Sequence, residues 1–427
     1  MPDSSQINIE AFNCEGGLVL NRSTFLMKPG EALKLENFEP DIEGGYRRIS
    51  GHRKFVNQVV PVTASSGEKV LMVATFADKV LAARGEKIFS SASTELGADI
   101  ASTTGMTGSG TITVDSTTGF STSGSIQIND ELFTYTGVTS SSFTGVTRAT
   151  ASSTAAAHTI NVVVSENWTE RDTGRSSADK YHFERFNFDG SDKIIFVDGA
   201  NAPVVFNTSI AATDVGASSV AGSKFVAAYR EHMFYAGKST TPQELVFSVP
   251  FDEDDFTASD GAGSIKVDDT IVGLKVFRES LFIFCENRIF KLTGSTLSDF
   301  AIQPVTRNIG CINGDTIQEF ATISRNIQSI FDTNIRDAAL FESVTIPDKT
   351  QYRIFFTKDG QTDSLTRGAI CVMKGEGFEF SEIRGIRPSC ADTFISTGDV
   401  FVLHGDFRGF VHRQESGNTF DGTVILG

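Results

Sequence analysis

The sequence predicts an all-β protein, a β-propeller-like assembly of short antiparallel hairpins in about six or seven blades, with a small inserted β-domain. One observation is a recurring unit: an apolar strand, a polar turn and a second strand. Another is the use of 36 Phe against one Trp, because Phe suits half-buried pleated surfaces. Since one hairpin cannot bury its apolar face alone, a tandem set implies blades or stacked sheets that share cores.

The individual strands are runs of about four to eight residues rich in Phe, Val and Ile, bounded by Gly, Asp, Asn or Ser. In chain order, hairpin strands are expected at 69–76 with 79–89, 193–197 with 204–206, 225–229 with 232–236 and 244–247, 274–277 with 280–284 and 288–292, 352–357, 369–373 with 377–380, and 400–404 with 409–413. Helical periodicity is nearly absent, and one short helix is expected at 322–331. The chain ends at 423–427 in what reads as a strand, and the short stretch 314–324 suggests that the natural polypeptide is longer.

Composition divides the chain into four segments. Residues 1–45 form an irregular N-terminal arm, 46–93 the first part of the propeller, 94–161 an inserted Ser/Thr-rich β-domain and 162–427 the remainder of the propeller. Without the arm and the insert, roughly 310 residues remain, and a four-stranded blade takes about 40–45 residues. Six or seven blades follow if the sheets close into a ring, which would remove exposed sheet edges. A pair of extended β-sandwiches is the alternative.

The insert has the composition of a linker but the pattern of a domain. Nearly half of residues 101–160 are Ser or Thr, and Arg148 is the only Lys or Arg among them. Such low complexity is typical of flexible linkers. However, short alternating runs separated by polar turns, at 111–114, 125–128, 132–135 and 142–146, favour a compact β-domain over disorder.

The net charge of −16 argues against a protein that grips nucleic acid by its phosphates, since that requires clustered Lys and Arg. It is compatible with DNA that passes an acidic wall without sticking to it. Solubility and control of self-association would explain the same charge.

The cysteines and the ends of the sequence bear on location. There is no CxxC pair, and an odd number of scattered cysteines suggests free thiols in a protein assembled in a reducing cytoplasm. No signal peptide and no membrane anchor is expected, because the sequence lacks a basic start followed by an apolar stretch and lacks a bilayer-length apolar run. The five cysteines are Cys14, Cys285, Cys311, Cys371 and Cys390.

No catalytic, cofactor-binding or metal-binding residues are predicted, and the chain is expected not to be an enzyme. The acidic run 252–255 does not match the twelve-residue calcium loop. The six histidines lack zinc-site spacing, although His404 and His412 lie on neighbouring predicted strands. Carboxylates that would suit glycoside hydrolysis, Asp198, Asp254 and Asp406, lie near turns, where acidic side chains commonly bind backbone amides.

Basic residues cluster once, and this cluster gives the candidate interface residues. An acidic stretch, 36–43, precedes it and is a possible intramolecular partner; a solvated face and a nucleic-acid patch are the other interpretations. The interface candidates are Tyr46, Arg47, Arg48, Arg53 and Lys54.

Several motifs resemble those of one group of virion proteins: the tail nozzle, or tail-hub and packaged-DNA-stabilisation, proteins of short-tailed bacteriophages. In the arm they are GLVLN at 17–21, KPGEAL at 28–33, LENFEP at 35–40 and GYRR at 45–48. Further similar blocks are 224–237, 245–250, 255–256, 261–263, 273–294 and 349–356. Within the insert, 112–120, 124–135 and 143–148 resemble a small β-module common in phage structural proteins. The sequence departs from the group near 320–322, where a further strand pair is usual, and by its short C-terminal region.

The resemblance implies a structural subunit of the phage tail, assembled in the host cytoplasm. Copies would form a homo-oligomeric, hexameric nozzle or hub ring that docks to an adaptor or portal-proximal protein and to tail fibres. The ring would retain packaged DNA and conduct it during ejection, without sequence-specific binding. A carbohydrate- or receptor-binding adhesin or tail-fibre component, with the insert as its tip, is the alternative. A secreted propeller hydrolase is a more distant one.

Overall fold

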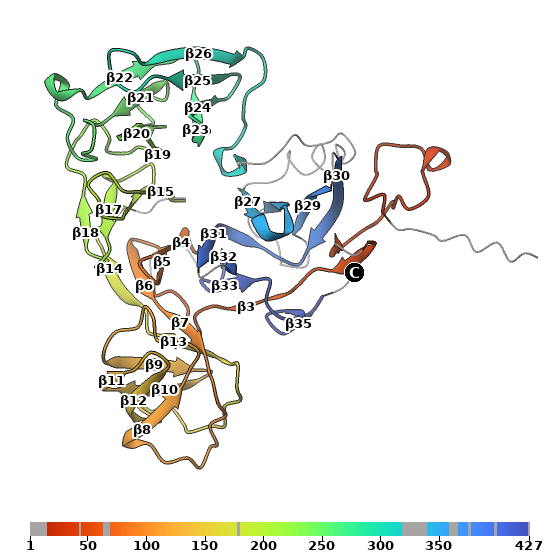
Figure 1. The fold of residues 1–427 in the computed structure, drawn as a ribbon, viewed down its shortest axis with the longest axis vertical. Coiled ribbons are helices and arrows are strands. Elements are labelled where there is room, and N and C mark those ends of the chain that lie inside the picture. Colours follow the sequence, from red (N-terminus) through yellow and green to blue (C-terminus); the bar gives the residue numbers. More distant parts are fainter. Residues whose placement is uncertain are drawn as a thin grey trace, which may run out of the picture. The chain divides into compact units, whose positions relative to one another are not determined.

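The computed structural model describes residues 15–41, 44–62, 69–176, 180–317, 340–357, 366–374, 377–396 and 399–425. Across these residues the regular structure is strands, with four 3₁₀ turns and no α-helix (Figure 1). The 3₁₀ turns are η1 (Thr24–Leu26), η2 (Ala258–Asp260), η3 (Gly314–Thr316) and η5 (Pro347–Lys349). No helix in the described ranges is long and apolar enough to cross a membrane. The predicted all-β class is confirmed, whereas the helix expected at 322–331 lies outside the described residues.

The chain forms two compact units. The larger unit comprises Arg53–Glu319 and Pro388–Gln414, and the smaller comprises Met1–His52, Phe320–Arg387 and Glu415–Gly427. Together their described parts contain six small antiparallel sheets of the kind that builds a β-propeller, five in the larger unit and one in the smaller.

Four sheets of the larger unit are four-stranded, and three of these follow the chain as simple meanders. The first has the order β14-β6-β5-β4, and its outer strand β14 comes from beyond the insert. The strands are β4 (Met72–Phe76), β5 (Lys79–Arg84), β6 (Lys87–Ser91) and β14 (Thr169–Asp172); β15 (His182–Phe186), β16 (Lys193–Val197), β17 (Val204–Asn207) and β18 (Ala212–Asp214); β19 (Phe225–Tyr229), β20 (His232–Ala236), β21 (Glu244–Phe247) and β22 (Gly263–Lys266); and β23 (Ile271–Phe277), β24 (Ser280–Cys285), β25 (Ile289–Thr293) and β26 (Ala301–Thr306).

The fifth sheet of the larger unit combines segments from distant parts of the chain. It contains β31 (Pro388–Ser396), β32 (Asp399–Asp406), β33 (Val411–Gln414) and the much earlier strand β3 (His52–Lys54), in the order β31-β32-β33-β3. Just after β3, the Phe55 amide donates a hydrogen bond to the Val411 carbonyl at 2.8 Å. This pairing joins the beginning and the end of the larger unit.

Neighbouring sheets bury their apolar faces against each other. Leu81 and Ile88 of the first sheet share a core cluster with Phe196 and Phe206 of the next. In the same way Phe234 and Phe247 pack with Leu281 and Ile283 of the sheet that follows. Each sheet thus depends on its neighbour for burial, which is the physical reason that the motif occurs in tandem.

The insert is a single sheet with its own core. Its strands follow the order β11-β12-β10-β9-β13-β7, and β8 also pairs with β12. Buried Ile126, Ile128, Phe133 and Phe143 belong to one cluster, so the predicted inserted β-domain is confirmed. The strands are β7 (Ser93–Glu95), β8 (Thr107–Thr113), β9 (Gly124–Ile128), β10 (Glu131–Tyr135), β11 (Gly137–Val138), β12 (Ser142–Thr147) and β13 (Val163–Glu166).

The smaller unit packs the N-terminal arm against one four-stranded sheet, where Leu18 shares a core with Tyr352 and Phe380. A buried ion-pair network fastens the arm: Arg353 lies 3.3 Å from Glu39 and 2.6 Å from Glu415. The strands of this sheet are β27 (Leu340–Ile346), β28 (Gln351–Thr357), β29 (Arg367–Lys374) and β30 (Gly377–Arg384). Two short antiparallel pairs complete the unit: β1 (Phe38–Pro40) pairs with β2 (Tyr46–Arg48), and β34 (Thr419–Phe420) pairs with β35 (Thr423–Val424).

Candidate functional site

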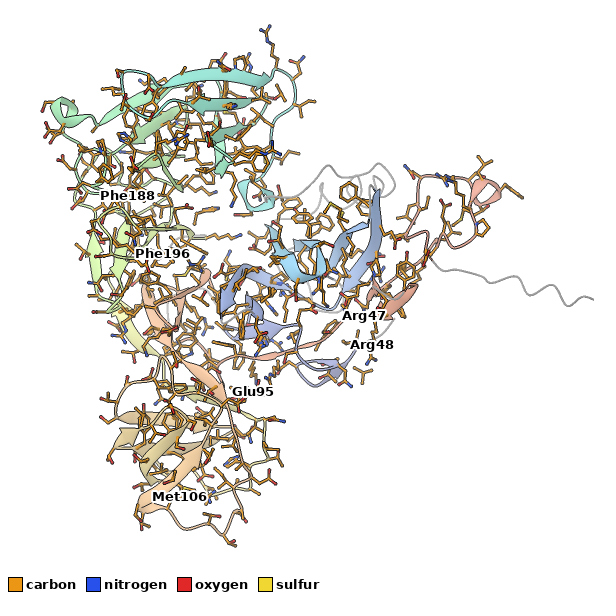
Figure 2. All side chains as sticks on the ribbon, in the orientation of Figure 1. Arg47, Arg48, Glu95, Met106, Phe188 and Phe196 are labelled. Carbon is orange, nitrogen blue, oxygen red and sulfur yellow. The ribbon has the colours of Figure 1, made fainter. Side chains whose placement is uncertain are left out.

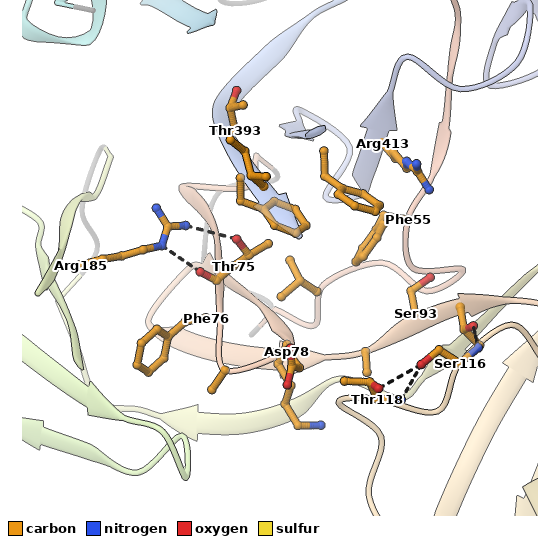
Figure 3. Close-up of a pocket in the computed structure, with 18 of the residues that line it drawn as sticks. Phe55, Thr75, Phe76, Asp78, Ser93, Ser116, Thr118, Arg185, Thr393 and Arg413 are labelled. Atoms are coloured by element: carbon orange, nitrogen blue, oxygen red, sulfur yellow. Dashed lines mark hydrogen bonds between the residues drawn. The ribbon is translucent and has the colours of Figure 1, made fainter. Parts of the chain in front are cut away.

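A pocket of about 1120 Å³ lies in the larger unit, where the first sheet, the β31–β33 sheet and the edge of the insert meet (Figure 3). Strands β3, β7, β31, β32 and β33 all contribute side chains to it. These strands come from both ends of the sequence, so the pocket exists only once the sheets have packed together.

One end of the pocket is cationic. Arg53 on β3 donates a hydrogen bond to the carboxylate of Glu95 on β7 and another to the Asn161 carbonyl at 3.2 Å. Arg413 on β33 approaches the same Glu95 oxygen only to 3.8 Å, which is too far for a hydrogen bond. Burial lowers the pKa of the Arg413 guanidinium and Arg53 lowers it further, against the opposing effect of Glu95. Two guanidinium groups therefore share one carboxylate.

Aromatic rings continue from this cationic end along the sheet. The Arg413 guanidinium lies over the Phe401 ring, 4.2 Å from its centroid, in a cation–π arrangement. Phe401 in turn stacks on Phe394, its cross-strand partner, with centroids 4.9 Å apart and an interplanar angle of 15°. Phe55 also lines this side of the pocket (Figure 3). The result is an aromatic platform, Phe55, Phe394 and Phe401, with a cation at one end.

The part of the pocket wall formed by β7 and the insert carries hydroxyls and carboxylates. Ser93 and Thr94 of β7 are joined there by Ser116 and Thr118 of the insert. The Ser116 and Thr118 hydroxyls are 3.0 Å apart (Figure 3). Asp78 and Asp115 also line the pocket. This wall offers both donors and acceptors.

Three other basic side chains of the pocket are already paired. Arg185 donates to Asp392 at 2.6 Å and to the Thr75 carbonyl at 3.0 Å. Lys79 lies 2.6 Å from Glu166, and Lys193 lies 2.9 Å from Glu253. Arg413 differs from these residues, because within the described ranges its guanidinium donates no hydrogen bond.

The five interface candidates fall into different units. In the smaller unit, Arg47 pairs with Glu39 at 3.0 Å and the Tyr46 hydroxyl donates to Glu379 at 3.0 Å. Arg48 is exposed on the same strand (Figure 2). In the larger unit, Arg53 and Lys54 line the pocket, and the Lys54 ammonium lies 4.4 Å from the Phe410 ring centroid.

Carboxylates that the sequence analysis considered for catalysis are occupied locally. Asp198 accepts hydrogen bonds from the backbone amides of Ala200 and Asn201, and Asp254 accepts one from Gly216. Burial opposes ionisation of Asp406, but hydrogen bonding from His412 and further contacts outweigh it and lower the pKa of this carboxyl. These are the roles expected of acidic residues at turns.

The acidic run and the histidine pair also have local explanations. Glu253 is buried against Lys193, whereas the Asp252 carboxylate accepts from the Asp254 amide, so the run does not converge on one point. His404 and His412 do lie together, with their rings stacked 4.9 Å apart. Of the cysteines, the four in the described ranges are free thiols, and Cys14 lies outside those ranges.

Comparison with known proteins gives likenesses of fold alone. No family model and no curated protein matches the sequence. An ancestral GH74 enzyme has a TM-score of 0.34 and 8% identity, covering 91% of this chain and 54% of that one. PorZ, a surface component of the type-IX secretion system of Porphyromonas gingivalis, has a TM-score of 0.32 and 10% sequence identity. The match covers 86% of this chain and 39% of PorZ. The N-terminal domain of Nup159 has a TM-score of 0.29 and 7% sequence identity. The match covers 58% of this chain and 78% of that domain.

Proposed function

We propose that this chain is a structural subunit of a bacteriophage tail. Its copies assemble by cyclic symmetry into a hexameric nozzle or hub ring, which docks to an adaptor and to tail fibres, retains packaged DNA and conducts it during ejection. The main support is the row of self-similar sheets packed face to face, because such a body is rigid and suits a function based on shape. The particular assembly is proposed from the motifs that resemble those of tail nozzle proteins.

The N-terminal arm offers a contact for assembly. At η1, Phe25 is 98% exposed and Leu26 is 70% exposed. The loop is nevertheless held in place, because Arg22 lies 2.5 Å from Glu31 and the Lys28 amide donates to Glu31 at 2.8 Å. A fixed loop that presents uncovered apolar side chains loses little entropy on binding and is typical of an interface anchor. In a ring, heterologous contacts of this kind repeat from one copy to the next.

The charge of −16 supports a conduit that does not hold its DNA tightly, because a mainly acidic surface repels the duplex. We also propose that the chain is not an enzyme. This proposal is supported by the local pairing of Asp198, Asp254 and Asp406.

Assembly is tested with the purified full chain by mass photometry and electron microscopy. We expect ring-shaped particles at micromolar concentration and fewer of them when Phe25→Ser and Leu26→Ser are combined. Leu297→Ser is the matched control, because Leu297 is a 48% exposed apolar side chain in the larger unit. A wild-type chain that stays monomeric, even with adaptor or fibre proteins added, would refute the proposal.

One observation favours the adhesin alternative, namely the pocket beside the insert. An aromatic platform next to an incompletely paired guanidinium is an arrangement that binds ligands.

A further inference from the structure

We propose that the pocket of the larger unit binds an acidic oligosaccharide, with a sugar ring against the Phe394 side of the aromatic platform and a sugar carboxylate held by Arg413 and Arg53. This activity is independent of ring assembly, because the pocket lies wholly within one unit of one chain.

The anionic group is inferred from the state of Arg413. A guanidinium carries five N–H donors in a planar fork that matches a carboxylate. In the described part of the chain Arg413 uses none of them for a hydrogen bond, and its nearest carboxylate, at 3.8 Å, is already bound by Arg53. The contact with Phe401 restricts the position of the guanidinium before a ligand arrives. A ligand carboxylate would supply the missing acceptors.

The sugar is inferred from the rest of the pocket. The C–H face of a pyranose ring is apolar and fits an aromatic platform, whereas its edge carries hydroxyls that need donors and acceptors. Other lining residues supply both: Ser93, Ser116, Thr118, Asp78 and Asp115. With about 1120 Å³, the pocket exceeds the range of about 300–1,000 Å³ usual for small-molecule sites. This size fits several linked sugar units better than one.

Two other ligand classes fit less well. A nucleic acid carries a negative charge on every unit, and Asp78 and Asp115 would repel it along the hydroxyl wall. An extended peptide binds best where strand edges offer unpaired backbone groups. Strand β7 pairs with β13 on one side, and on the other the Glu95 carbonyl accepts from the Asp115 amide. The wall therefore presents mainly side-chain hydroxyls.

The test is isothermal titration calorimetry of the full chain with a sialylated trisaccharide and with a tetrasaccharide that contains a single glucuronate. Maltotetraose serves as the neutral probe, and a Glu-rich peptide serves as the anionic probe without sugar rings. We expect at least one acidic saccharide to bind more tightly than both of these probes, with an affinity that falls as salt rises.

Variants then test the two halves of the site. A hydrogen-bonded charge contributes about 1.5–3 kcal/mol, so Arg413→Gln should weaken binding about 10- to 100-fold. Phe394→Ala removes the ring against which the sugar packs, and it should weaken the binding of the same saccharide. Arg278→Gln is the matched control, because Arg278 lies over Phe277 at 5.1 Å in a different sheet, and it should leave the affinity unchanged. Circular dichroism and melting curves establish that each variant is folded.

Three results would overturn the inference. The first is that no acidic saccharide binds at millimolar concentration, and the second is that maltotetraose binds as tightly as the acidic saccharides. The third is that the Glu-rich peptide binds as tightly as they do and that Arg413→Gln abolishes this peptide binding as well. The last result would identify the pocket as a peptide site. The Phe25→Ser, Leu26→Ser double variant should lose rings and keep saccharide binding, so failure of the assembly proposal and failure of this one are distinguishable.

Discussion

The insert and the blade sheets are both antiparallel β-structure, but different interactions organise their interiors. In the insert, Arg148 is buried at the centre of a hydrogen-bond network. It donates to both oxygens of Glu131 at 2.8 Å and to the carbonyls of Ala101, Thr104 and Ala156 at 2.8, 2.9 and 2.7 Å. His158 lies 2.8 Å from the same Glu131 carboxylate. One saturated polar centre thus joins loops that contain little apolar surface.

In the blade sheets, the core around Phe234 is built from aromatic rings that pack on one another. Phe234 is fully buried, and its ring lies 5.3 Å from that of Phe247 and 5.7 Å from that of Phe300. Such contacts depend on buried area and shape and involve no charge. The difference teaches that the Ser/Thr-rich insert combines its apolar core with one fully satisfied polar centre, whereas in the blade core around Phe234 the rings pack on one another.

The largest effect is expected from Arg148→Met. This change leaves the buried Glu131 carboxylate without its main partner, and breaking a buried pair in this way costs about 3–5 kcal/mol. We expect faster hydrogen exchange in peptides from 124–147, with little change in peptides from 225–247. Hydrogen exchange followed by mass spectrometry resolves the two regions.

Arg171→Met is the control for this experiment. Arg171 is a half-buried arginine of β14 that donates to the Ser90 hydroxyl at 2.8 Å, and its removal should leave exchange in the insert unchanged. If Arg148→Met altered exchange in the blades as much as in the insert, the two interiors would not be separately organised.

A somewhat smaller effect is expected from Phe234→Ala. Replacing a buried Phe by Ala lowers the free energy of unfolding by about 3–5 kcal/mol. We expect about 3 kcal/mol here, because the surrounding rings can partly fill the space. Exchange should accelerate in peptides covering β20 and β24, with the insert unaffected. Phe234→Leu should cost less than half as much, and equal costs for Leu and Ala would show that the cavity is not what matters.

The contrast between the regions also explains what the sequence could predict. The strands followed from local alternation, and Ser125–Ile128 and Leu132–Tyr135 were identifiable even within a Ser/Thr-rich segment. The turn at Ala77 and Asp78 lies where strands 69–76 and 79–89 predicted it, although both residues have positive φ values of 47° and 60°, which are usual for Gly or Asn. Packing on both sides of the hairpin overrides the local preference there.

The pocket depended on contacts that no local pattern reveals. Arg53 was among the predicted interface residues, but its partner Glu95 and the adjacent Arg413 are distant in sequence and meet through the pairing of β3 with the last sheet of the larger unit. Arg148 stood out as the only Lys or Arg of its segment, and yet composition gives no sign that it is buried. Long-range strand pairing therefore determines the site, whereas local periodicity determines the strands.

The smallest of the expected effects is acid destabilisation of the insert. Burial alone would raise the pKa of Glu131, but hydrogen bonds from Arg148, the Ala156 amide and His158 lower it from its usual 4.5 to about 2. Because the pKa of Glu131 is lower in the folded than in the unfolded protein, its ionised carboxylate stabilises the folded state. This contribution is complete above pH 4.5 and is lost as the pH falls toward 2. By about pH 3 roughly 2 kcal/mol should be gone. Exchange in peptides from 124–147, corrected for the intrinsic pH dependence of exchange, should accelerate over this range. Glu131→Gln, which removes the titrating group, should flatten that profile, and an unchanged profile in this variant would mean that the acid sensitivity of the insert has another origin.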